Sequence, residues 1–499
     1  MDSKFNRRDF IKTVGLGASV LTLSEFNLFS WQFNKKPNII FILADDLGYG
    51  ELGCYGQKKI RTPNIDMLAA QGIRFTQHYS GSPVCAPSRC VLLTGKHTGH
   101  SYIRANDEMP ERGDVWHDPS LEGQRPIPLN TITIAKLLKK AGYITGAIGK
   151  WGLGGPESTG EPNKQGFDFW YGYLCQRVAH NYYPDHLWRN GKKEILEGNK
   201  YFFPHQKLPK DKNPYDKASY EPYKGKQYSF DLMLKEAIKF IKKNKNRPFF
   251  LYLPFTIPHV ALQVPDDSLK EYEGAFPETP YKGEKGYLPH PTPRAAYAAM
   301  ITRMDRGIGK IMSLLKELGI DGNTLVIFTS DNGPTFNGGT DSKFFNSAGP
   351  LRGLKASLYE GGIRVPMIAR WPGKIRPGSK SELISAFWDF LPTFSEIAGV
   401  KAPGDIDGIS ILPTLLGHPE KQKKHKYLYW EYVGNQAVRM GDWKAVRHGV
   451  NKEIELYNLK NDIGERNNVA DKYPEVVKQI EEIMKNARTK SKLFPLVRK

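Results

Sequence analysis

Four short apolar runs are the feature of this sequence that most constrains its fold. They cover residues 38–43, 143–148, 248–253 and 324–329. Uninterrupted runs of this length are typical of strands that are buried on both faces, as in a parallel sheet. Segments with apolar residues at helical spacing lie between them, at residues 131–141, 230–242 and 295–318. Strands that alternate with helices predict an α/β fold with a mostly parallel sheet flanked by helices.

Chemically reactive side chains follow each of these runs. They are Asp45 and Asp46, Lys150, His259, and Asp331 with Asn332. Any one of them is explained equally well as a turn residue or a helix cap. Ligands of such sheets, however, bind beyond the carboxyl ends of the strands, where we expect these residues to meet. Together they predict a metal-dependent site for an anion, and oxygen-only ligands suit Ca²⁺ or Mg²⁺ better than zinc.

The N-terminus has the pattern of an export signal. Arg7 and Arg8 precede an apolar stretch, residues 13–23, with roughly half of the ~20 residues that a bilayer span needs. This pattern resembles a twin-arginine signal peptide, which we place at residues 1–33. A basic amphipathic arm is the alternative. The signal predicts the twin-arginine export machinery as a partner and a periplasmic or secreted protein, and no other stretch has the pattern of a transmembrane segment.

The charge of the chain favours anionic partners. There are 72 Lys and Arg against 52 Asp and Glu, a formal charge of +20. Nucleic acid, acidic polysaccharide and anionic lipid are all consistent with such a surplus, as is a plain solvated basic surface. No nucleic-acid-binding motif is found, so we expect no nucleic-acid partner. Four cysteines are too few for a disulfide framework in a chain of 499 residues.

The chain changes character from about residue 421. Residues 427–431, 436–440 and 443–447 alternate as short strands of an antiparallel sheet do, and residues 474–487 have the pattern of an amphipathic helix. We therefore expect a main domain at residues 34–420 and a small C-terminal α+β subdomain, with an antiparallel sheet, at residues 421–499.

The segment around Cys85 carries the most specific motif. Residues 82–95 read as a loop that runs into a short helix, with Cys85 at the junction, where a helix N-terminus favours an anion. A buried cysteine is the plain alternative. The sequence Cys-Ala-Pro-Ser-Arg, followed by Leu-Leu-Thr-Gly, resembles the signature of the formylglycine-dependent (type I) sulfatases of the alkaline phosphatase superfamily. Further matches to that family run in family order at residues 44–48, 142–151, 330–333, 355–366 and 455–459.

The resemblance implies roles for the matching residues. It implies an alkaline phosphatase-like fold, with a large mixed sheet, and a formylglycine that a maturation enzyme makes from Cys85. Cys85 would complete a calcium site, or a magnesium site, with Asp45, Asp46, Asp331 and Asn332. One hydroxyl of the hydrated aldehyde would attack sulfur and the other would then expel sulfate. Arg89 would hold the formylglycine, Lys150 and Lys355 would bind sulfate oxygens, and His259 would protonate the leaving alcohol.

One position departs from the family pattern. Gly152 stands where the family has a histidine that contacts the formylglycine hydroxyl. His180 is a candidate to reach the pocket from a segment, residues 166–228, that is rich in Tyr, Trp, Pro and Lys. His97, His100, Arg104 and Asn106 are weaker candidates for the same mouth, because exposed loops often carry such residues without a function.

These observations predict an exported sulfatase that acts on a sulfated carbohydrate or another sulfate ester. The first alternative is a phosphonate monoester or phosphodiester hydrolase of the same superfamily, since the modified cysteine can also serve phosphorus esters. The second alternative is a non-catalytic polyanion-binding protein on the same scaffold.

Overall fold

The computed structural model describes residues 35–107 and 122–497. The expected signal peptide, residues 1–33, lies outside the described residues. The four predicted strands are all present, as β1 (Asn38–Ala44), β4 (Ile144–Lys150), β8 (Phe249–Pro254) and β9 (Thr324–Ser330). They are neighbours in one ten-stranded sheet of order β11-β2-β10-β9-β1-β8-β4-β5-β6-β7. The remaining strands of this sheet are β2 (Ile73–Phe75), β5 (Phe169–Tyr173), β6 (His186–Arg189), β7 (Lys192–Ile195), β10 (Met367–Arg370) and β11 (Ser379–Ser381).

The sheet is parallel at its centre and mixed at its edges. β9, β1, β8, β4 and β5 pair in parallel, so their carboxyl ends lie on the same edge. β10 is antiparallel to β9 and to β2, and β5, β6 and β7 pair antiparallel. A separate parallel pair is formed by β3 (His78–Tyr79) and β12 (Ser385–Ala386). The predicted large, mixed, mostly parallel sheet is confirmed.

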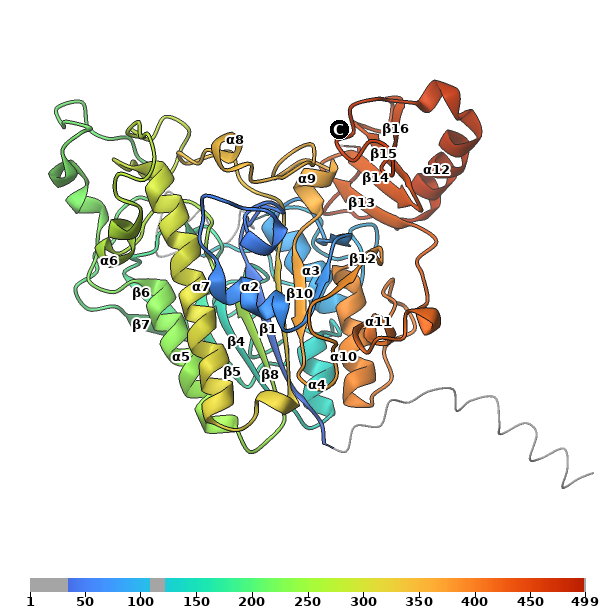
Figure 1. Ribbon diagram of the computed structural model, residues 1–499, viewed down its shortest axis with the longest axis horizontal. Coiled ribbons are helices and arrows are strands. Elements are labelled where there is room, and N and C mark those ends of the chain that lie inside the picture. Colours follow the sequence, from blue (N-terminus) through green and yellow to red (C-terminus); the bar gives the residue numbers. More distant parts are fainter. Residues whose placement is uncertain (1–34, 108–121, 498–499) are drawn as a thin grey trace, which may run out of the picture. The chain divides into compact units, whose positions relative to one another are not determined.

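Helices cover both faces of the central strands (Figure 1). The α-helices are α2 (Pro63–Ala70), α3 (Cys85–Thr94), α4 (Ile134–Lys140), α5 (Ser229–Asn244), α6 (Asp266–Leu269), α7 (Pro293–Glu317), α8 (Ser342–Phe345), α9 (Glu360–Ile363), α10 (Phe390–Ala398), α11 (Leu412–Leu415) and α12 (Pro474–Asn486). Single 3-10 turns are η1 (Gly53–Tyr55), η3 (Val178–His180), η4 (Lys217–Tyr223), η5 (Lys270–Tyr272), η6 (Asp321–Asn323), η7 (Phe387–Asp389), η8 (Pro419–Lys421) and η9 (Ala470–Lys472).

The central strand β1 shows why its sequence is apolar without alternation. Ile40 and Ile42 belong to a core cluster with residues of α5 and α7, such as Phe230 and Met304. Phe41 points to the opposite face, where its ring packs against Phe390 and Phe394 of α10. Each side chain is therefore buried, whichever face it points to.

The predicted C-terminal subdomain contains four strands rather than three. β13 (Leu428–Tyr432), β14 (Asn435–Met440), β15 (Trp443–Arg447) and β16 (Ile454–Asn458) form an antiparallel sheet. Ile480 and Met484 of α12 pack on this sheet, so the amphipathic helix is confirmed as well. Residues from Lys35 onward nevertheless group as one compact unit, and the boundary at residues 420 and 421 stays a prediction.

A buried ion-pair network ties this subdomain to the segment that carries α9. Lys444 of β15 is fully buried and lies 3.0 Å from Glu360 and 3.2 Å from Glu465. Tyr79 donates a hydrogen bond to Glu360 as well. Burial, together with the charge of Glu360, raises the pKa of Glu465 to about 7, although Lys444 acts in the opposite direction. The C-terminal sheet is thus connected to the segment of α9 by ion pairs between fully buried side chains.

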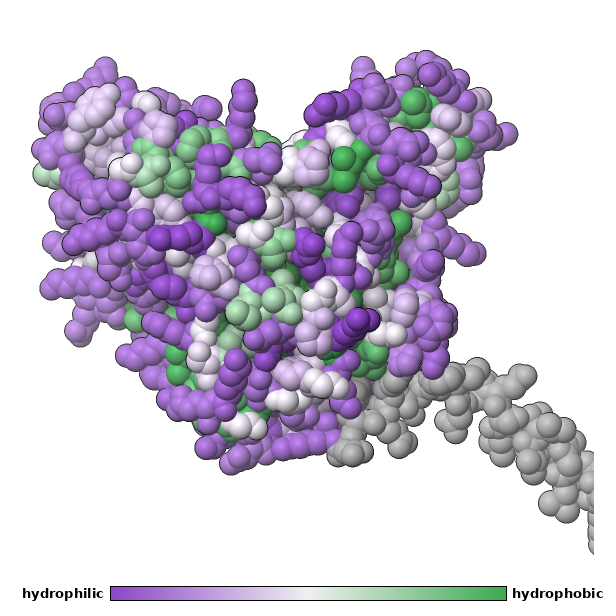
Figure 2. All heavy atoms as spheres, viewed as in Figure 1, coloured by the Kyte–Doolittle hydropathy of each residue, from purple (hydrophilic) through white to green (hydrophobic). Residues whose placement is uncertain are grey.

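The face drawn in Figure 2 is mostly hydrophilic, with hydrophobic residues in small groups. Among the residues that the structure describes, no helix is both long and apolar enough to cross a membrane.

Candidate active site

The predicted reactive residues meet at the carboxyl ends of the central strands. Ala44 is in register with Ser330, so that Asp45 and Asp46 follow β1 beside Asp331 and Asn332, which follow β9. Lys150 is the last residue of β4, and His259 lies in the loop after β8. All of these side chains are buried. The topology of the sheet thus brings together four segments that are far apart in the sequence.

Three carboxylates and one amide form an oxygen-rich cluster. The backbone of Asp46 has φ 66, in the left-handed region that Asp and Asn tolerate better than most residues. Its carboxylate accepts a hydrogen bond from Asn332 Nδ2 at 2.7 Å, and its N–H donates to Asp331 Oδ1 at 3.1 Å. Asn332 Oδ1 is buried and has no hydrogen-bond partner among the described residues. A buried acceptor of this kind, next to carboxylates, is what an oxygen-liganded cation requires.

Cys85 is the first residue of α3, as expected from the motif, and it adjoins this cluster. Its Sγ lies 3.3 Å from Asp45 Oδ1 and 3.7 Å from Lys355 Nζ. Burial and the charge of Asp45 raise the pKa of the Cys85 thiol, so the unmodified side chain is a neutral thiol at neutral pH. The side chain is only 1% exposed, which is less than we expected for a residue at a pocket.

Arg89, one turn along α3, holds the cluster together. Its guanidinium donates to Asp331 Oδ2 at 2.8 and 3.1 Å, lies 3.2 Å from Asp45 Oδ2, and also donates to the carbonyl of Lys150 at 2.5 Å. A fully buried arginine with two carboxylate partners is stable only when its charge is compensated in this way. Arg89 therefore fixes the relative positions of β1, β4 and β9 at their ends.

Charges in the site are balanced. Three carboxylates (Asp45, Asp46 and Asp331) face three cations (Arg89, Lys150 and Lys355), with Lys150 2.6 Å from Asp45 and Lys355 2.8 Å from Asp46.

The neighbouring charges affect the pKa values of two of the carboxylates in opposite directions. Burial alone would raise the pKa of Asp45, but Lys150, His259 and Arg89 hold it well below its usual value. Burial and the neighbouring charge of Asp45 raise the pKa of Asp331 to about 6. A cation bound beside Asp331 would oppose this effect and favour its charged form.

His259 completes the wall of the site. Its Nε2 lies 3.6 Å from Asp46 Oδ2, and its Nδ1 donates to the carbonyl of Val260 at 2.5 Å. Burial and the charge of Lys355 lower the pKa of His259 to about 3, so the ring is neutral in the free site at pH 7. A negatively charged ester beside Lys150 and Lys355 would oppose this effect and favour a proton on Nε2.

His180 does reach the site. Its ring is stacked on that of His259, with centroids 4.8 Å apart and an interplanar angle of 18°. His205 lies 3.0 Å from His180 Nδ1, and the Tyr287 ring lies 5.0 Å from the His180 ring. His205 and Tyr287 were not predicted. His205 is in the aromatic segment singled out in the sequence, whereas nothing in the sequence marks Tyr287.

The structure shows what surrounds the departure at position 152. Gly152 has φ +80, a conformation in which any other residue is strained. A Cβ atom there would lie 3.6 Å from Gln176 Oε1 and 3.9 Å from Ala86. Gln176 Oε1 is buried and has no hydrogen-bond partner among the residues described. The polar side chain beside this position is therefore Gln176, which the sequence did not single out.

The weaker substrate candidates contact other segments, with one exception. His100 Nδ1 contacts Asp407 at 2.9 Å, and His97 Nε2 lies 3.5 Å from the same carboxylate. Arg104 is buried and forms an ion pair with Glu431 of β13 at 2.8 Å. His100 and Arg104 are thus bound to residues of other segments, and their place at the mouth stays a prediction. Asn106, by contrast, accepts a hydrogen bond from the N–H of Ala86, next to Cys85.

Known proteins are similar to this chain along nearly its whole length. The sulfatase family model matches residues 37–400, and the model of the N-sulphoglucosamine sulphohydrolase C-terminal region matches residues 354–490. An N-acetylgalactosamine-6-O-sulfatase of Bacteroides thetaiotaomicron is 30% identical over 92% of this chain and 94% of its own length. Human arylsulfatase A is 34% identical over 82% of this chain and 75% of its own length.

A solved structure agrees with these relatives. The crystal structure of Ps i-CgsB in complex with k-i-k-neocarrahexaose has a TM-score of 0.72 and 32% identity, and the match covers 91% of this chain and 93% of the other. The sulfatase family model, which matches residues 37–400, includes Cys85, Lys150 and Asp331. These residues come together at the edge of the sheet. The chain belongs to the sulfatase family of the alkaline phosphatase superfamily, and it is an enzyme that hydrolyses sulfate esters.

Proposed function

We propose that this enzyme removes sulfate from carbohydrates, with a formylglycine made from Cys85 as nucleophile and a calcium ion as cofactor. The substrate class is supported by the relatives. One is named for N-acetylgalactosamine 6-sulfate, and Ps i-CgsB was crystallised with a carrageenan hexasaccharide. The observation that carries the proposal is the surroundings of Cys85, which combine carboxylates, two lysines and a histidine in one buried cluster.

The residues present fit a hard divalent cation. Asp45, Asp46, Asp331 and Asn332 would hold it, and the unsatisfied Asn332 Oδ1 is the clearest sign that a ligand position is available. When bound, such a cation supplies positive charge that acidifies and orients the nucleophile. The cluster has three negative and three positive side chains, so a divalent cation leaves two net positive charges, which favours an anionic ester.

The thiol itself is poorly suited to the reaction. Its raised pKa keeps it protonated, although only a thiolate is a strong nucleophile. A formylglycine supplies a hydrated aldehyde, whose hydroxyl is the attacking group. Arg89 and Asp45, on either side of position 85, would then orient that hydroxyl. Mg²⁺ in place of Ca²⁺ would be held by the same oxygens, with water completing a smaller shell.

Lys150 and Lys355 bind and neutralise the ester. Their Nζ atoms contact Asp45 and Asp46 from two different segments, so both ammonium groups face the same space near Sγ of Cys85. Donors that are fixed before the substrate arrives stabilise charge that develops on sulfate oxygens in the transition state. The ring of His259 adjoins this space and protonates the departing alcohol oxygen.

His259→Ala is expected to affect substrates unequally. A sugar hydroxyl leaves as a strong base, whereas nitrophenol leaves easily without a proton. General acid catalysis contributes about 10²- to 10⁴-fold, so the variant should lose about that factor on a sugar sulfate and far less on nitrophenyl sulfate. Steady-state kcat/KM on both substrates measures the difference.

His448→Ala is the matched control, because His448 is an exposed histidine beside Glu455 in the C-terminal subdomain. It should change both substrates by the same small factor. An equal loss on both substrates in His259→Ala would show that His259 only holds its loop.

Comparing ester classes on the wild-type enzyme tests the proposal itself. We expect turnover of a sulfated monosaccharide, chosen from a panel of galactose, N-acetylgalactosamine and glucosamine sulfates, to exceed turnover of a phenyl phosphonate monoester. Faster cleavage of the phosphonate would favour the phosphorus-ester alternative. No turnover of any sulfated sugar, with turnover of nitrophenyl sulfate retained, would contradict the substrate class alone.

We also propose that the enzyme is exported to the periplasm or secreted after maturation by a formylglycine-generating enzyme. The proposal rests on Arg7, Arg8 and the short apolar stretch behind them. These residues lie outside the described part of the chain.

A further inference from the structure

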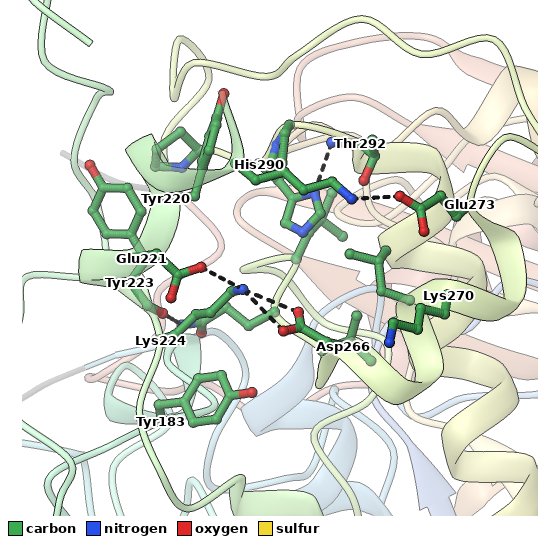
Figure 3. Close-up of a pocket in the computed structure, with 17 residues that line it drawn as sticks. Tyr183, Tyr220, Glu221, Tyr223, Lys224, Asp266, Lys270, Glu273, His290 and Thr292 are labelled. Carbon is green, nitrogen blue, oxygen red and sulfur yellow. Dashed lines mark hydrogen bonds and ion pairs between the residues drawn. The ribbon is translucent and has the colours of Figure 1, made fainter. Parts of the chain in front are cut away.

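A second cavity lies between two surface segments, away from the residues of the sulfate site. It has a volume of about 290 Å³ and is formed by η4 on one side and by α6, η5 and residues 289–292 on the other (Figure 3). This volume is at the lower end of the range of ligand pockets, about 300–1,000 Å³. The cavity therefore suits a single ring with its substituents, either free or as one residue of a longer chain.

Part of the cavity lining is apolar and aromatic. Leu262, Val264 and Leu269 line the cavity together with two prolines. Tyr183, Tyr220 and Tyr223 line it as well and lie on the same side in Figure 3. Tyr220 donates its hydroxyl to the carbonyl of Pro214, so its orientation is set by a partner outside the cavity lining. Rigid aromatic rings of this kind offer a flat apolar surface to the C–H face of a ligand ring.

The rim is charged but balanced. Three lysines (Lys217, Lys224 and Lys270) and three carboxylates (Glu221, Asp266 and Glu273) line it. Two ion pairs connect the segments on either side of the cavity, Lys217 with Glu273 and Lys224 with Asp266. Positive charges that are already paired leave little net attraction for an anion. The cavity thus differs from the sulfate site, where a bound cation would leave a positive surplus.

His290 adds a directed polar group. Its Nδ1 accepts a hydrogen bond from the N–H of Thr292 at 3.1 Å. Burial and the charge of Lys224 lower the pKa of His290 to about 4, so the ring is neutral, and its proton is on Nε2 because Nδ1 accepts. A neutral imidazole N–H suits a hydroxyl group of a ligand.

We propose that this cavity is a second carbohydrate-binding site, which holds an uncharged sugar ring. A sugar ring combines an apolar C–H face with hydroxyl groups, and the cavity combines an aromatic wall with a neutral donor and a charge-balanced rim. The site goes beyond the proposed function, since its occupant carries no sulfate to be hydrolysed. Its failure would leave turnover at Cys85 unaffected.

The cavity wall is connected to the loops of the sulfate site. Gln263 lines the cavity, accepts a hydrogen bond from the N–H of Tyr182, and donates to the carbonyl of Tyr223. Tyr182 in turn donates its hydroxyl to the carbonyls of Thr256 and His259. A sugar in the cavity therefore contacts segments that continue directly to His180 and His259, and it would order them for a substrate.

Titration of the wild-type enzyme with a chemically desulfated carrageenan hexasaccharide, followed by calorimetry, tests the site. We expect saturable binding that inorganic sulfate does not displace, because sulfate occupies the other site. Leu269→Trp fills the cavity and Tyr223→Ala removes part of its wall. Each should weaken binding by about tenfold or more, a change of about 1.4 kcal/mol, with turnover of nitrophenyl sulfate within about twofold of wild type.

Leu129→Trp, at an exposed leucine elsewhere, is the matched control and should bind as wild type does. Three outcomes would overturn the proposal: undiminished binding in Leu269→Trp, displacement of the hexasaccharide by sulfate, or binding of naphthol, an apolar ring, without binding of the hexasaccharide. The sulfate competition needs no variant, so it decides the question even if a substitution disturbs folding.

Discussion

Replacing Cys85 by alanine is expected to abolish hydrolysis of sulfate esters, with a loss of about 10⁴-fold or more in kcat, because the proposed nucleophile is made from this side chain. Sγ has polar neighbours, Asp45 and Lys355, so little apolar packing is lost. The free energy of unfolding should therefore change by only about 1 kcal/mol. Initial rates on nitrophenyl sulfate and thermal unfolding of the purified variant measure the two effects. Activity within tenfold of wild type would contradict the role of Cys85.

Cys85→Ser separates the two hydroxyl functions. The serine hydroxyl is similar in size to the thiol, but it lacks the second hydroxyl that would release sulfate. This variant should at best accumulate a sulfated enzyme, which mass spectrometry of the intact protein detects. Repeated turnover by the serine variant would show that one hydroxyl is sufficient.

Removing Asp46 or Asp331 is expected to eliminate metal binding and activity together. Each carboxylate is a large part of the negative charge available to a cation, and fewer oxygen ligands weaken a hard-cation site sharply. Wild type should gain stability when Ca²⁺ is added, by about 2.7 kcal/mol at a concentration of 100 times Kd. Asp46→Ala and Asp331→Ala should show neither this gain nor turnover, as measured by thermal unfolding and elemental analysis.

Each variant also removes an ion-pair partner. Asp331→Ala leaves the buried Arg89 with fewer partners, which costs about 3 kcal/mol, and Asp46→Ala leaves Lys355 without the carboxylate that lies 2.8 Å from it. Asp305→Asn is the matched control. Asp305 is a buried carboxylate that accepts hydrogen bonds from Asn64 and the N–H of Ile65, neither of which belongs to the cluster. Normal metal content and activity in Asp46→Ala would remove Asp46 from the site.

Much of the fold was predictable because its central strands are buried on both faces. Burial on two faces requires a continuous apolar run, as in β1 and β9, and that pattern is visible in the sequence. Several of the strands that escaped prediction are short, such as β7 and β10, with four residues each. β7 has the sequence Lys-Lys-Glu-Ile and contains no buried residue. In β16, polar and apolar residues do not alternate regularly, so its sequence was interpreted only as a family motif. Such strands depend on their neighbours for stability rather than on their own composition.

That the reactive side chains lie together was also predictable, since parallel strands bring their carboxyl ends to one edge. What the sequence could not provide is which loops return to that edge. Tyr287, beside His180, comes from a loop more than a hundred residues away from it in the chain. Gln176 lies beside Gly152, whose backbone is in the left-handed region. The spacing of residues in the sequence does not reveal this neighbour.

His100 and Arg104 show another feature that the sequence does not reveal. Both follow the signature helix closely, and proximity in sequence suggested a place at the mouth, which stays a prediction. Each is bound to a carboxylate of a distant segment, Asp407 or Glu431. Charged residues in loops are as often held by a partner from elsewhere in the fold as they are presented to a ligand, and the partner is invisible until the fold is known.

The mass of the peptide that contains position 85, measured on enzyme purified in active form, tests the central claim most directly. We expect Cys85 to have lost its thiol and to have the mass of an aldehyde, or of its hydrate, in a fraction of molecules that follows specific activity across preparations. An unmodified thiol at Cys85 in enzyme that turns over sulfate esters would contradict it.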